Sequence, residues 1–336
     1  MKNATLKDIA KAAGVSAMSV SKALNNKPGI SEETRKRILR VAEELHYTQN
    51  MVAKSLRTEE TMTIGVVLSD SSEMVTSRIL WGIHDMAKEH HYSVIIANTD
   101  RSEETEKEAV ETLINKRIDG LIMVAPIRNS TDYMTWLQNF GIPLVLLMRQ
   151  NQKQSVDTVI NDNFLGGYQI VEHLTRQKCR NFAFLPLLNS QSGTERIAGY
   201  SQALRQLKID YDDCPSLLTA PFINDGYQNM KKLLESGVNF DALVCGCDTI
   251  AIGAMSALLE AGISIPKDVC VTGYDGIELA SYLMVPLTTI VQPLYEMGQQ
   301  GTEILLDRIK YPSIPVRKII LKSELLVQGS TKRTVK

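Results

Sequence analysis

The chain of 336 residues has a formal net charge of −1, contains five cysteines and includes no low-complexity segment. This length leaves room for two or three compact units. No apolar run approaches the roughly 18 residues that a transmembrane helix needs, and the N-terminus lacks the apolar core of a secretion signal. Because the cysteines are odd in number and scattered, we expect reduced thiols and a cytoplasmic location.

The first 58 residues differ in charge from the rest of the chain. They contain eleven Lys and Arg against five Asp and Glu, a balance of +6, which leaves −7 for the remainder. A basic segment on an acidic body indicates phosphate binding at one end only. We therefore expect binding to nucleic acid that weakens steeply with salt.

This basic segment predicts three short helices. Thr5 is a good N-cap, and Asp8 follows three residues later, as in a capping box. Gly14 supplies a turn, Ser16 caps a second helix, and a third helix starts at Ser31. Two helices joined by a glycine turn are typical of the helix-turn-helix, whose second helix enters the major groove. Spacing alone is also compatible with any small helical bundle.

From Met62 onward, short β-branched runs alternate with helical stretches. This order predicts parallel sheets with helices on both faces. This alternation of strands and helices occurs in two successive halves, which indicates a bilobed sensor that binds its ligand at the ends of the strands. We expect strands at 63–68, 92–97, 120–124, 143–147, 181–185, 241–245 and 269–272, and helices at 77–90, 103–116, 164–176, 194–207, 225–236, 249–261 and 295–309.

The order of residues is more specific than their spacing. The N-terminal segment reads Leu6-x-Asp8-Ile9-Ala10-x-x-Ala13-Gly14-Val15-Ser16-x-x-Ser19-Val20-Ser21-Lys22-x-Leu24-Asn25, followed by Thr34-Arg35-x-x-Ile38 and Asn50-x-x-Ala53-x-x-Leu56. It resembles the DNA-binding domain of the lac-repressor (LacI/GalR) family. The body carries Asp162-Asn163, Arg196-x-x-Gly199-Tyr200, Asp248-x-x-Ala251-x-Gly253, Gly273-Tyr-Asp275 and Pro286-Leu-Thr-Thr-x-x-Gln292. These motifs resemble the effector domain of the same family, which is itself similar to periplasmic sugar-binding proteins.

The resemblance implies a fold and a set of domain boundaries. The fold is an all-α helix-turn-helix head with a hinge helix, followed by a periplasmic-binding-protein-like α/β body of two doubly wound parallel-sheet lobes. The expected domains are 1–48 for the head, 49–60 for the hinge helix and linker, 61–330 for the effector-binding and dimerisation domain, and 331–336 for a tail. The N-lobe would take about 61–160 plus 291–321, and the C-lobe about 161–290 plus 322–330. The chain would cross between lobes near 157–162, 289–292 and 321–324.

The resemblance also implies DNA contacts. In the family, the recognition helix reads bases with residues that match Ala17, Met18 and Lys22. Lys22 can donate to guanine O6 and N7, but the family more often has arginine there, so the fork geometry is lost. Ala17 and Met18 can only make apolar contacts. Ser16, Ser19, Ser21 and Asn25 suit phosphate or base-edge contacts, with capping or a solvated face as the alternative for the serines. The remaining DNA-binding candidates in the head are Thr5 and Leu6.

A hinge helix is expected between the head and the body. Asn50 can cap it, and Ala53 is small enough for close helix approach. In the family, two such helices pair in the minor groove and the leucine matching Leu56 wedges between bases, which kinks the duplex. The family's usual arginine after Ala53 is Lys54 here. The alternative for Leu56 is packing on the adjacent domain.

The effector site is expected between the lobes. Arg196 and Asp275 stand in motifs whose residues bind effector in the family, and would donate to and accept from sugar hydroxyls; a structural ion pair is the alternative. Three departures from the family pattern are Cys247 for asparagine, Met148 for aspartate and no aromatic residue in 73–76. They indicate an unusual effector or a site less suited to sugars. The weaker candidates are Asp70, Ser190, Ser192, Phe222, Asp248 and Gln292.

These features together predict a dimeric repressor on double-stranded palindromic operator DNA, controlled by a small effector such as a carbohydrate. No metal is expected, because Cys245-Gly-Cys247 is too short for the usual zinc spacing. No cofactor or membrane partner is expected, and without a phosphate loop or nucleophile motif neither is an enzyme. The tail 329–336 lacks apolar heptads, which favours a dimer over a tetramer. The alternatives are control by a protein co-repressor and, in another class, a sugar-binding protein without a regulatory role.

Overall fold

The computed structural model describes residues 4–47, 60–127, 130–151, 156–188 and 190–333. The chain divides into two compact units, Met1–Thr61 and Met62–Lys336. Among the described residues, no helix is long and apolar enough to cross a membrane.

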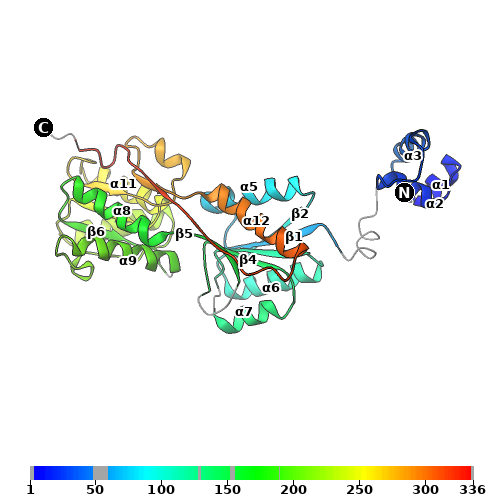
Figure 1. Ribbon diagram of the computed structural model, residues 1–336. Coiled ribbons are helices and arrows are strands. Elements are labelled where there is room, and N and C mark those ends of the chain that lie inside the picture. Colours follow the sequence, from blue (N-terminus) through cyan, green and yellow to red (C-terminus); the bar gives the residue numbers. More distant parts are fainter. Residues whose placement is uncertain (1–3, 48–59, 128–129, 152–155, 189, 334–336) are drawn as a thin grey trace. The chain divides into compact units, whose positions relative to one another are not determined.

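The N-terminal unit contains helices α1 (Leu6–Ala13), α2 (Ala17–Leu24) and α3 (Glu32–Glu44) (Figure 1). Gly14 ends α1 with a φ of +66°, a left-handed conformation that glycine adopts at low cost. The capping box predicted at the start of α1 is present. The three helices close around a small core whose fully buried side chains are Ile9, Val20 and Ile38. The predicted helix-turn-helix is thus confirmed.

The first lobe of the body, the N-lobe, is built on a parallel sheet with the strand order β10-β5-β4-β3-β1-β2. Helices α5 and α12 pack side by side on one face, and α6 and α7 cover the other (Figure 1). The strands are β1 (Thr63–Leu68), β2 (Ser93–Asn98), β3 (Gly120–Val124), β4 (Leu144–Leu147), β5 (Asp157–Asn161) and β10 (Lys318–Leu321), and the helices are α5 (Met74–Glu89), α6 (Glu103–Asn115), α7 (Thr131–Gln138) and α12 (Leu294–Lys310).

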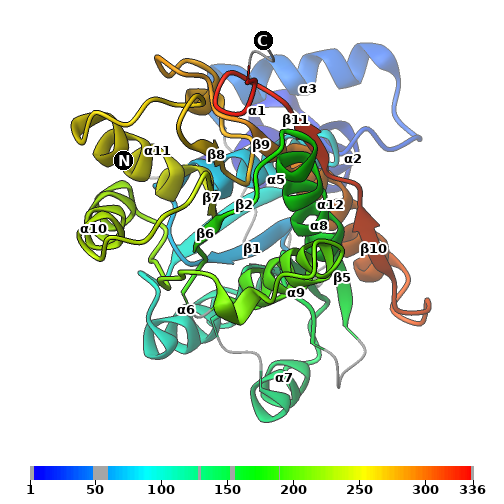
Figure 2. The same ribbon diagram turned by 90° about the vertical axis from the view of Figure 1, so that its left-hand side faces the viewer.

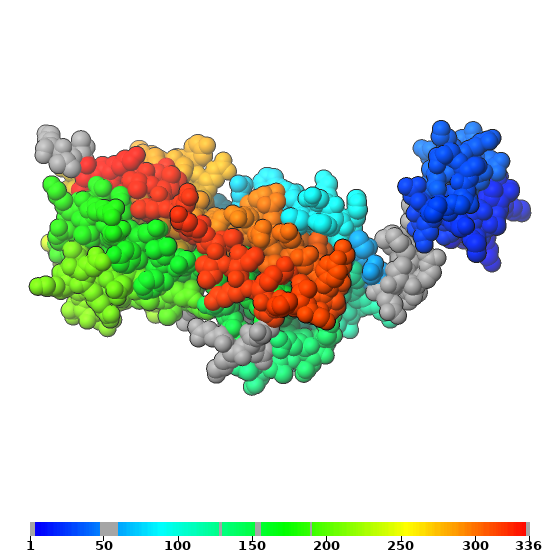
Figure 3. Space-filling view, viewed as in Figure 1, coloured from blue at the N-terminus to red at the C-terminus, as the bar shows by residue number. Residues whose placement is uncertain are grey.

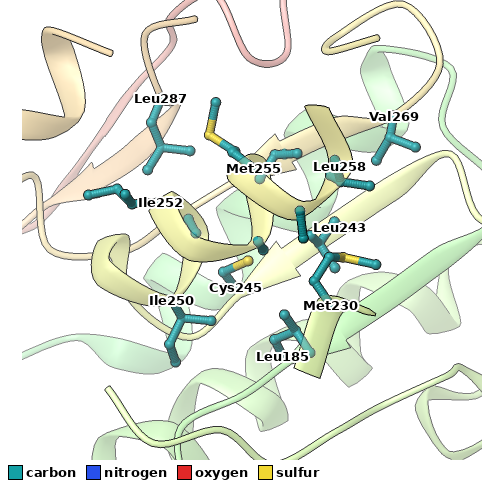
Figure 4. Close-up of a cluster of buried hydrophobic side chains, with 14 of the residues drawn as sticks. Leu185, Met230, Leu243, Cys245, Ile250, Ile252, Met255, Leu258, Val269 and Leu287 are labelled. Carbon is teal, nitrogen blue, oxygen red and sulfur yellow. The ribbon is translucent and has the colours of Figure 1, made fainter. Parts of the chain in front are cut away.

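The second lobe, the C-lobe, has a parallel sheet with the order β6-β7-β8. Helices α8 and α9 cover one face, and α10 and α11 cover the other (Figure 2). The α11 side is a dense apolar layer, with Leu243, Ile250 and Leu258 fully buried (Figure 4). The bounds are β6 (Phe182–Leu185), β7 (Ala242–Cys245), β8 (Cys270–Thr272), α8 (Asn163–Arg176), α9 (Gln191–Arg205), α10 (Ile223–Glu235) and α11 (Asp248–Glu260), with short 3-10 turns at Tyr211–Asp213 and Glu278–Ser281.

The chain passes between the lobes at three points. It leaves β5 and enters α8 at Asp162, leaves β9 (Thr289–Val291) and enters α12 at Gln292 and Pro293, and leaves β10 to enter β11 (Glu324–Leu326) through Lys322 and Ser323. The last of these segments lies on the surface of both lobes (Figure 3). We call these three points the crossings.

The predicted fold class is confirmed, with local differences. Helix α9 begins at Gln191, three residues before the predicted start, because the Ser190 side chain caps it by accepting from Gly193 N–H at 3.3 Å. Helix α5 likewise begins at Met74. The sequence pattern predicts no element for α7, β5, β9, β10 or β11, although 157–162, 289–292 and 321–324 are predicted crossings between the lobes. The predicted tail also differs, since Thr331 is fully buried in the C-lobe.

Candidate DNA-binding helix and effector site

Helix α2 presents an apolar tip. Ala17 and Met18 are exposed, and Met18 retains 71% of its accessible surface. Ser16 precedes them as the N-cap, and its Oγ accepts a hydrogen bond from Ser19 N–H at 3.1 Å. A capping oxygen keeps a spare lone pair and a rotatable proton, so a phosphate contact is compatible with this role. Lys22 lies half-buried on the last turn of the helix.

Other polar candidates in the head also make local bonds. Thr5 donates from Oγ1 to Asp8 Oδ2 at 2.7 Å within the capping box. The Asn25 side chain donates to the Ser21 carbonyl oxygen at 2.7 Å, at the end of α2. Leu6 packs against the small core. These contacts stabilise the helices and leave the predicted DNA roles of the same residues untested.

Arg35 stands in the Thr34-Arg35-x-x-Ile38 motif, from which no specific role was predicted for it. Its guanidinium, on α3, donates to the carbonyl oxygen of Ala23 at 3.0 Å and to that of Lys27 at 2.8 Å. A cation at the C-terminal end of a helix binds the free carbonyls and complements the helix dipole. Arg35 therefore fixes the end of α2 against α3. The hinge candidates Asn50, Ala53, Lys54 and Leu56 lie outside the described residues.

In the body, the carboxyl ends of the N-lobe strands form the edge that faces the C-lobe. Two strands of this parallel sheet, β5 and β10, run directly into the C-lobe from their carboxyl ends. The loops that follow β1, β2, β3 and β4 start from the same edge. Ligands bind at such edges in open α/β sheets, so this edge and the opposing C-lobe loops form the candidate effector site.

Arg196 occupies the centre of the C-lobe side. It is 2% exposed, donates from Nε to Asn163 Oδ1 at 3.1 Å and from Nη1 to the Gly246 carbonyl oxygen at 2.5 Å. Its Nη2 lies 3.8 Å from Asp275 Oδ1, and its guanidinium lies 3.5 Å from the centroid of the Tyr274 ring. The ion pair between Arg196 and Asp275, which was the alternative to an effector role, is thus present and buried, and effector binding by these two residues stays a prediction.

Asp275 connects Arg196 to the crossings. Its Oδ1 accepts from Gln292 Nε2 at 2.5 Å, and Gln292 Oε1 in turn accepts from the Asn161 side chain. Asn161 ends β5, so these bonds link two crossings. Burial raises the pKa of Asp275 to about 6, in spite of the nearby Arg196 guanidinium. We call Asn161, Asn163, Arg196, Asp275 and Gln292 the crossing network.

One acceptor of the crossing network is free. Asn161 is 4% exposed, and its Oδ1 has no hydrogen-bond partner among the described residues. A buried polar atom without a partner costs free energy and is a feature to be explained. Asn161 was not among the predicted site residues; its one signal in the sequence is its position directly before the Asp162-Asn163 motif, at the end of β5.

Asp248 has a different environment from the one expected. It is fully buried, accepts from Thr289 Oγ1 at 2.6 Å and from Ile277 N–H at 2.9 Å. Burial, with the Asp275 carboxylate as the second cause, raises its pKa well above the usual range. These bonds hold the loop that carries Asp275, which makes Asp248 a positioning residue for it.

The serine candidates lie at the start of α9. Ser190 caps the helix, and its hydroxyl lies 2.8 Å from that of Ser192. On the N-lobe side, Asp70 accepts from the Ser72 hydroxyl at 2.6 Å, which holds the pKa of Asp70 below its usual value. Each of these polar groups has a local partner in the structure.

Phe222 does lie toward the other lobe. Its ring, 45% exposed, lies 5.0 Å from the guanidinium of Arg101 of the N-lobe. Cys247, the departure next to Asp248, is buried, and burial raises the pKa of its thiol to about 12. Met148 packs against the N-lobe core. No cluster of His, Cys, Asp and Glu suited to a metal ion occurs in the described ranges.

Comparison with known proteins assigns the family. Residues 5–50 match the model of the bacterial regulatory proteins of the lacI family, and residues 61–324 match that of the periplasmic binding proteins and sugar binding domain of the LacI family. The chain belongs to the LacI family. This membership confirms the predicted class, a DNA-binding transcriptional regulator and not an enzyme, together with the predicted fold.

Named relatives of this LacI-family chain cover between 80% and 98% of it. The ribose operon repressor of Haemophilus influenzae is 32% identical over 97% of this chain and 98% of its own length. The crystal structure of the lac repressor dimer bound to operator and the anti-inducer ONPF has a TM-score of 0.91 at 29% identity, covering 98% of this chain and 99% of that one. A LacI-family regulator from Enterococcus faecium with bound ribose has a TM-score of 0.73 at 31% identity, covering 80% and 98%.

Proposed function

We propose that this regulator is a homodimeric repressor that acts in the cytoplasm, and that its affinity for a palindromic operator changes when a small carbohydrate binds between the lobes. The observation that carries the effector part is the crossing network. It joins the candidate ligand site to two of the points about which the lobes turn. A ligand that bonds to this network therefore acts directly on the angle between the lobes.

The chemistry of the network favours a polyhydroxylated ligand. Asp275 and the free Asn161 Oδ1 accept hydrogen bonds, and Arg196 donates them. Adjacent hydroxyls of a sugar provide both partners at once. Among sugars we propose a pentose of the size of ribose first, because one relative is named a ribose operon repressor and another holds bound ribose.

The homodimer is supported by exposed apolar side chains on both lobes. In the N-lobe these include Trp81 on α5 and Ile96 on the edge strand β2, at 60% and 51% exposure. In the C-lobe Tyr282 and Met284 are exposed at 77% and 97%. Exposed apolar groups and unpaired sheet edges favour protein–protein contact. A two-fold dimer presents two recognition helices, which suits a palindromic operator.

The proposal is tested by titrating D-ribose against the full chain bound to a duplex that it selects from a random library. We expect ribose to change operator affinity, and to raise the unfolding temperature of the DNA-free protein by mass action. Arg196→Lys should remove both effects, because a lysine cannot reproduce the fork of bonds. Arg176→Lys, exposed on α8, is the matched control.

Two results would contradict the proposal. If the dimer selected no duplex from the library, the proposed binding to a specific operator would be wrong. A selected duplex whose affinity no carbohydrate alters would remove the effector part and favour a protein co-repressor. Linkage supplies an internal check, since an effector that weakens operator binding must itself bind less tightly to the DNA complex by the same factor.

A further inference from the structure

The two lobes touch at the sheet edge opposite the crossings. In the N-lobe, β5 and β10 lie at one edge and β2 lies at the other. Four strand spacings of about 4.8 Å separate β5 from β2, so this second edge lies roughly 19 Å from the crossings. When two lobes turn about one side of a cleft, contacts at the far side separate most. A contact there is consequently sensitive to small opening motions.

The contact at that edge is a cation–π pair. Arg101 follows β2, and its guanidinium carbon lies 5.0 Å from the centroid of the Phe222 ring, which precedes α10 in the C-lobe. This distance is within the range for attraction between a guanidinium and an aromatic face. Glu73, at the start of α5, forms an ion pair with Arg101. Val75 adds an apolar contact, since it packs against the cores of both lobes.

The backbone at Arg101 is held in an unusual shape. Asp100 and Arg101 have φ values of 48° and 61°, both in the left-handed region that non-glycine residues rarely adopt. Arg101 N–H donates to the Ser69 carbonyl oxygen at 3.2 Å, and Ser71 N–H donates to Asn98 Oδ1 at 3.0 Å. Two loops thus hold this conformation in place. Strained backbone kept by its surroundings is typical of functional positions.

We propose that Glu73, Arg101 and Phe222 form a latch that holds the two lobes together in the effector-free protein and must open for an effector to enter the cleft. Glu73 orients the guanidinium, Arg101 reaches across, and the Phe222 ring receives it. The latch therefore competes with any ligand for the Phe222 face. This inference does not depend on which effector the site binds.

The test measures the distance between the two sides of the cleft by pulsed electron–electron spin resonance. Nitroxide labels are placed at Glu104→Cys and Asn224→Cys, both exposed and each close to the latch. The background carries Cys214→Ser, since the other four cysteines are buried. Labelled full-length chain is mixed with an excess of unlabelled chain so that only one protomer of a dimer reports.

We expect one short distance in the parent protein. Arg101→Ala and Phe222→Ala should each shift the ratio of closed to open molecules by about two- to fivefold toward open, the size of an exposed cation–π pair. The double variant should open no further than the stronger single one, because both remove the same contact. The ratio of closed to open molecules in Arg101→Lys should lie between those of the parent and Arg101→Ala, because lysine keeps the charge but lacks the planar guanidinium.

The matched control is Arg78→Ala. The Arg78 guanidinium lies 5.8 Å from the Trp81 ring, a cation–π pair within α5 that spans no cleft, and its loss should leave the distances unchanged. Unchanged distances in both single latch variants would overturn the proposal, as would additive opening in the double variant. The distances are measured without ligand, whereas ribose titration of the parent reports on the crossing network, so the latch and the effector site fail independently.

Discussion

The guanidinium of Arg35 on α3 donates to the carbonyl oxygen of Ala23 on α2 at 3.0 Å. Through this bond the third helix of the head fixes α2 at its C-terminal end. The same guanidinium also donates to the Lys27 carbonyl oxygen, so it ties the end of the helix to the loop that follows. Loss of one side chain thus removes several constraints on the end of α2, the helix that we propose reads the operator.

Arg35→Ala should destabilise the head by about 1–3 kcal/mol, because hydrogen bonds from a charged group contribute about this much when partly buried. Operator affinity should fall with it. Urea unfolding followed by circular dichroism, with operator binding in parallel, measures both. The control is Arg40→Ala, which removes only an exposed pair with Glu44. Equal effects of the two changes would contradict the role of Arg35.

Asp275 should make stability depend on pH. Burial raises its pKa from 3.8 to about 6, so the folded protein keeps this proton at pH values where the unfolded chain has released it. The folded state is therefore favoured at acidic pH, and this contribution is lost as pH rises through about 6. Relative to Asp275→Asn, the parent should lose about 1 kcal/mol between pH 5 and 7.

Urea unfolding of the parent and of Asp275→Asn across this range gives the difference directly. Effects of other titrating groups cancel where the variant leaves them unchanged. A difference that is flat, or that grows in favour of the parent with pH, would show that the carboxyl titrates outside this window. Effector affinity should instead increase as pH rises through about 6. The ionised carboxylate of Asp275 is the better hydrogen-bond acceptor, and it is protonated below that pH.

Gly167 should control the position of Arg196. A Cβ built on Gly167 of α8 would lie 2.4 Å from the Arg196 backbone oxygen on α9, closer than any real contact. Gly167→Ala must therefore push the two helices apart, at a cost of about 1–3 kcal/mol, and displace the guanidinium from Asn163. Ribose affinity and thermal unfolding report the two effects. Ala198→Ser, exposed on α9, should change neither.

The last described residues stabilise the C-lobe. Thr331 is fully buried, and its Oγ1 lies 2.8 Å from His173 Nε2 and 2.8 Å from Thr288 Oγ1. Thr331→Val keeps the shape but leaves both partners without this bond, so we expect a loss of about 1–3 kcal/mol in unfolding free energy. Lys332→Ala, at an exposed site, serves as control. Identical stabilities would indicate that this segment adds nothing to the lobe.

The hinge prediction concerns Leu56, which lies outside the described residues. Leu56→Ala should reduce the affinity for operator more than the affinity for random DNA, because a wedge between bases depends on how easily the sequence unstacks. Fluorescence anisotropy with both duplexes at one salt concentration measures the ratio. Equal losses on the two duplexes would favour packing of Leu56 on the adjacent domain instead.

Much of this molecule follows from local sequence. Caps and turns at Thr5, Gly14 and Ser16 define the helix-turn-helix, since each acts within four residues of itself. The alternation of apolar strands and amphipathic helices likewise predicts the two lobes, because each strand and helix is visible as a local pattern in the sequence. The motif order further indicated Arg196 and Asp275, which do lie together.

Other features depend on distant parts of the chain. Asn161 meets Gln292 across 131 positions, and Arg101 meets Phe222 only because strand order places β2 opposite the crossings. Local patterns cannot specify which loops share an edge, so they indicated neither the pairing of Arg101 with Phe222 nor the free acceptor of Asn161. Asp248 is a further example. Its motif could be recognised in the sequence, but its bonds to Ile277 and Thr289 depend on how distant segments pack. The sequence alone thus determined the class of protein and most of its helices and strands, and the tertiary structure decided which side chains meet.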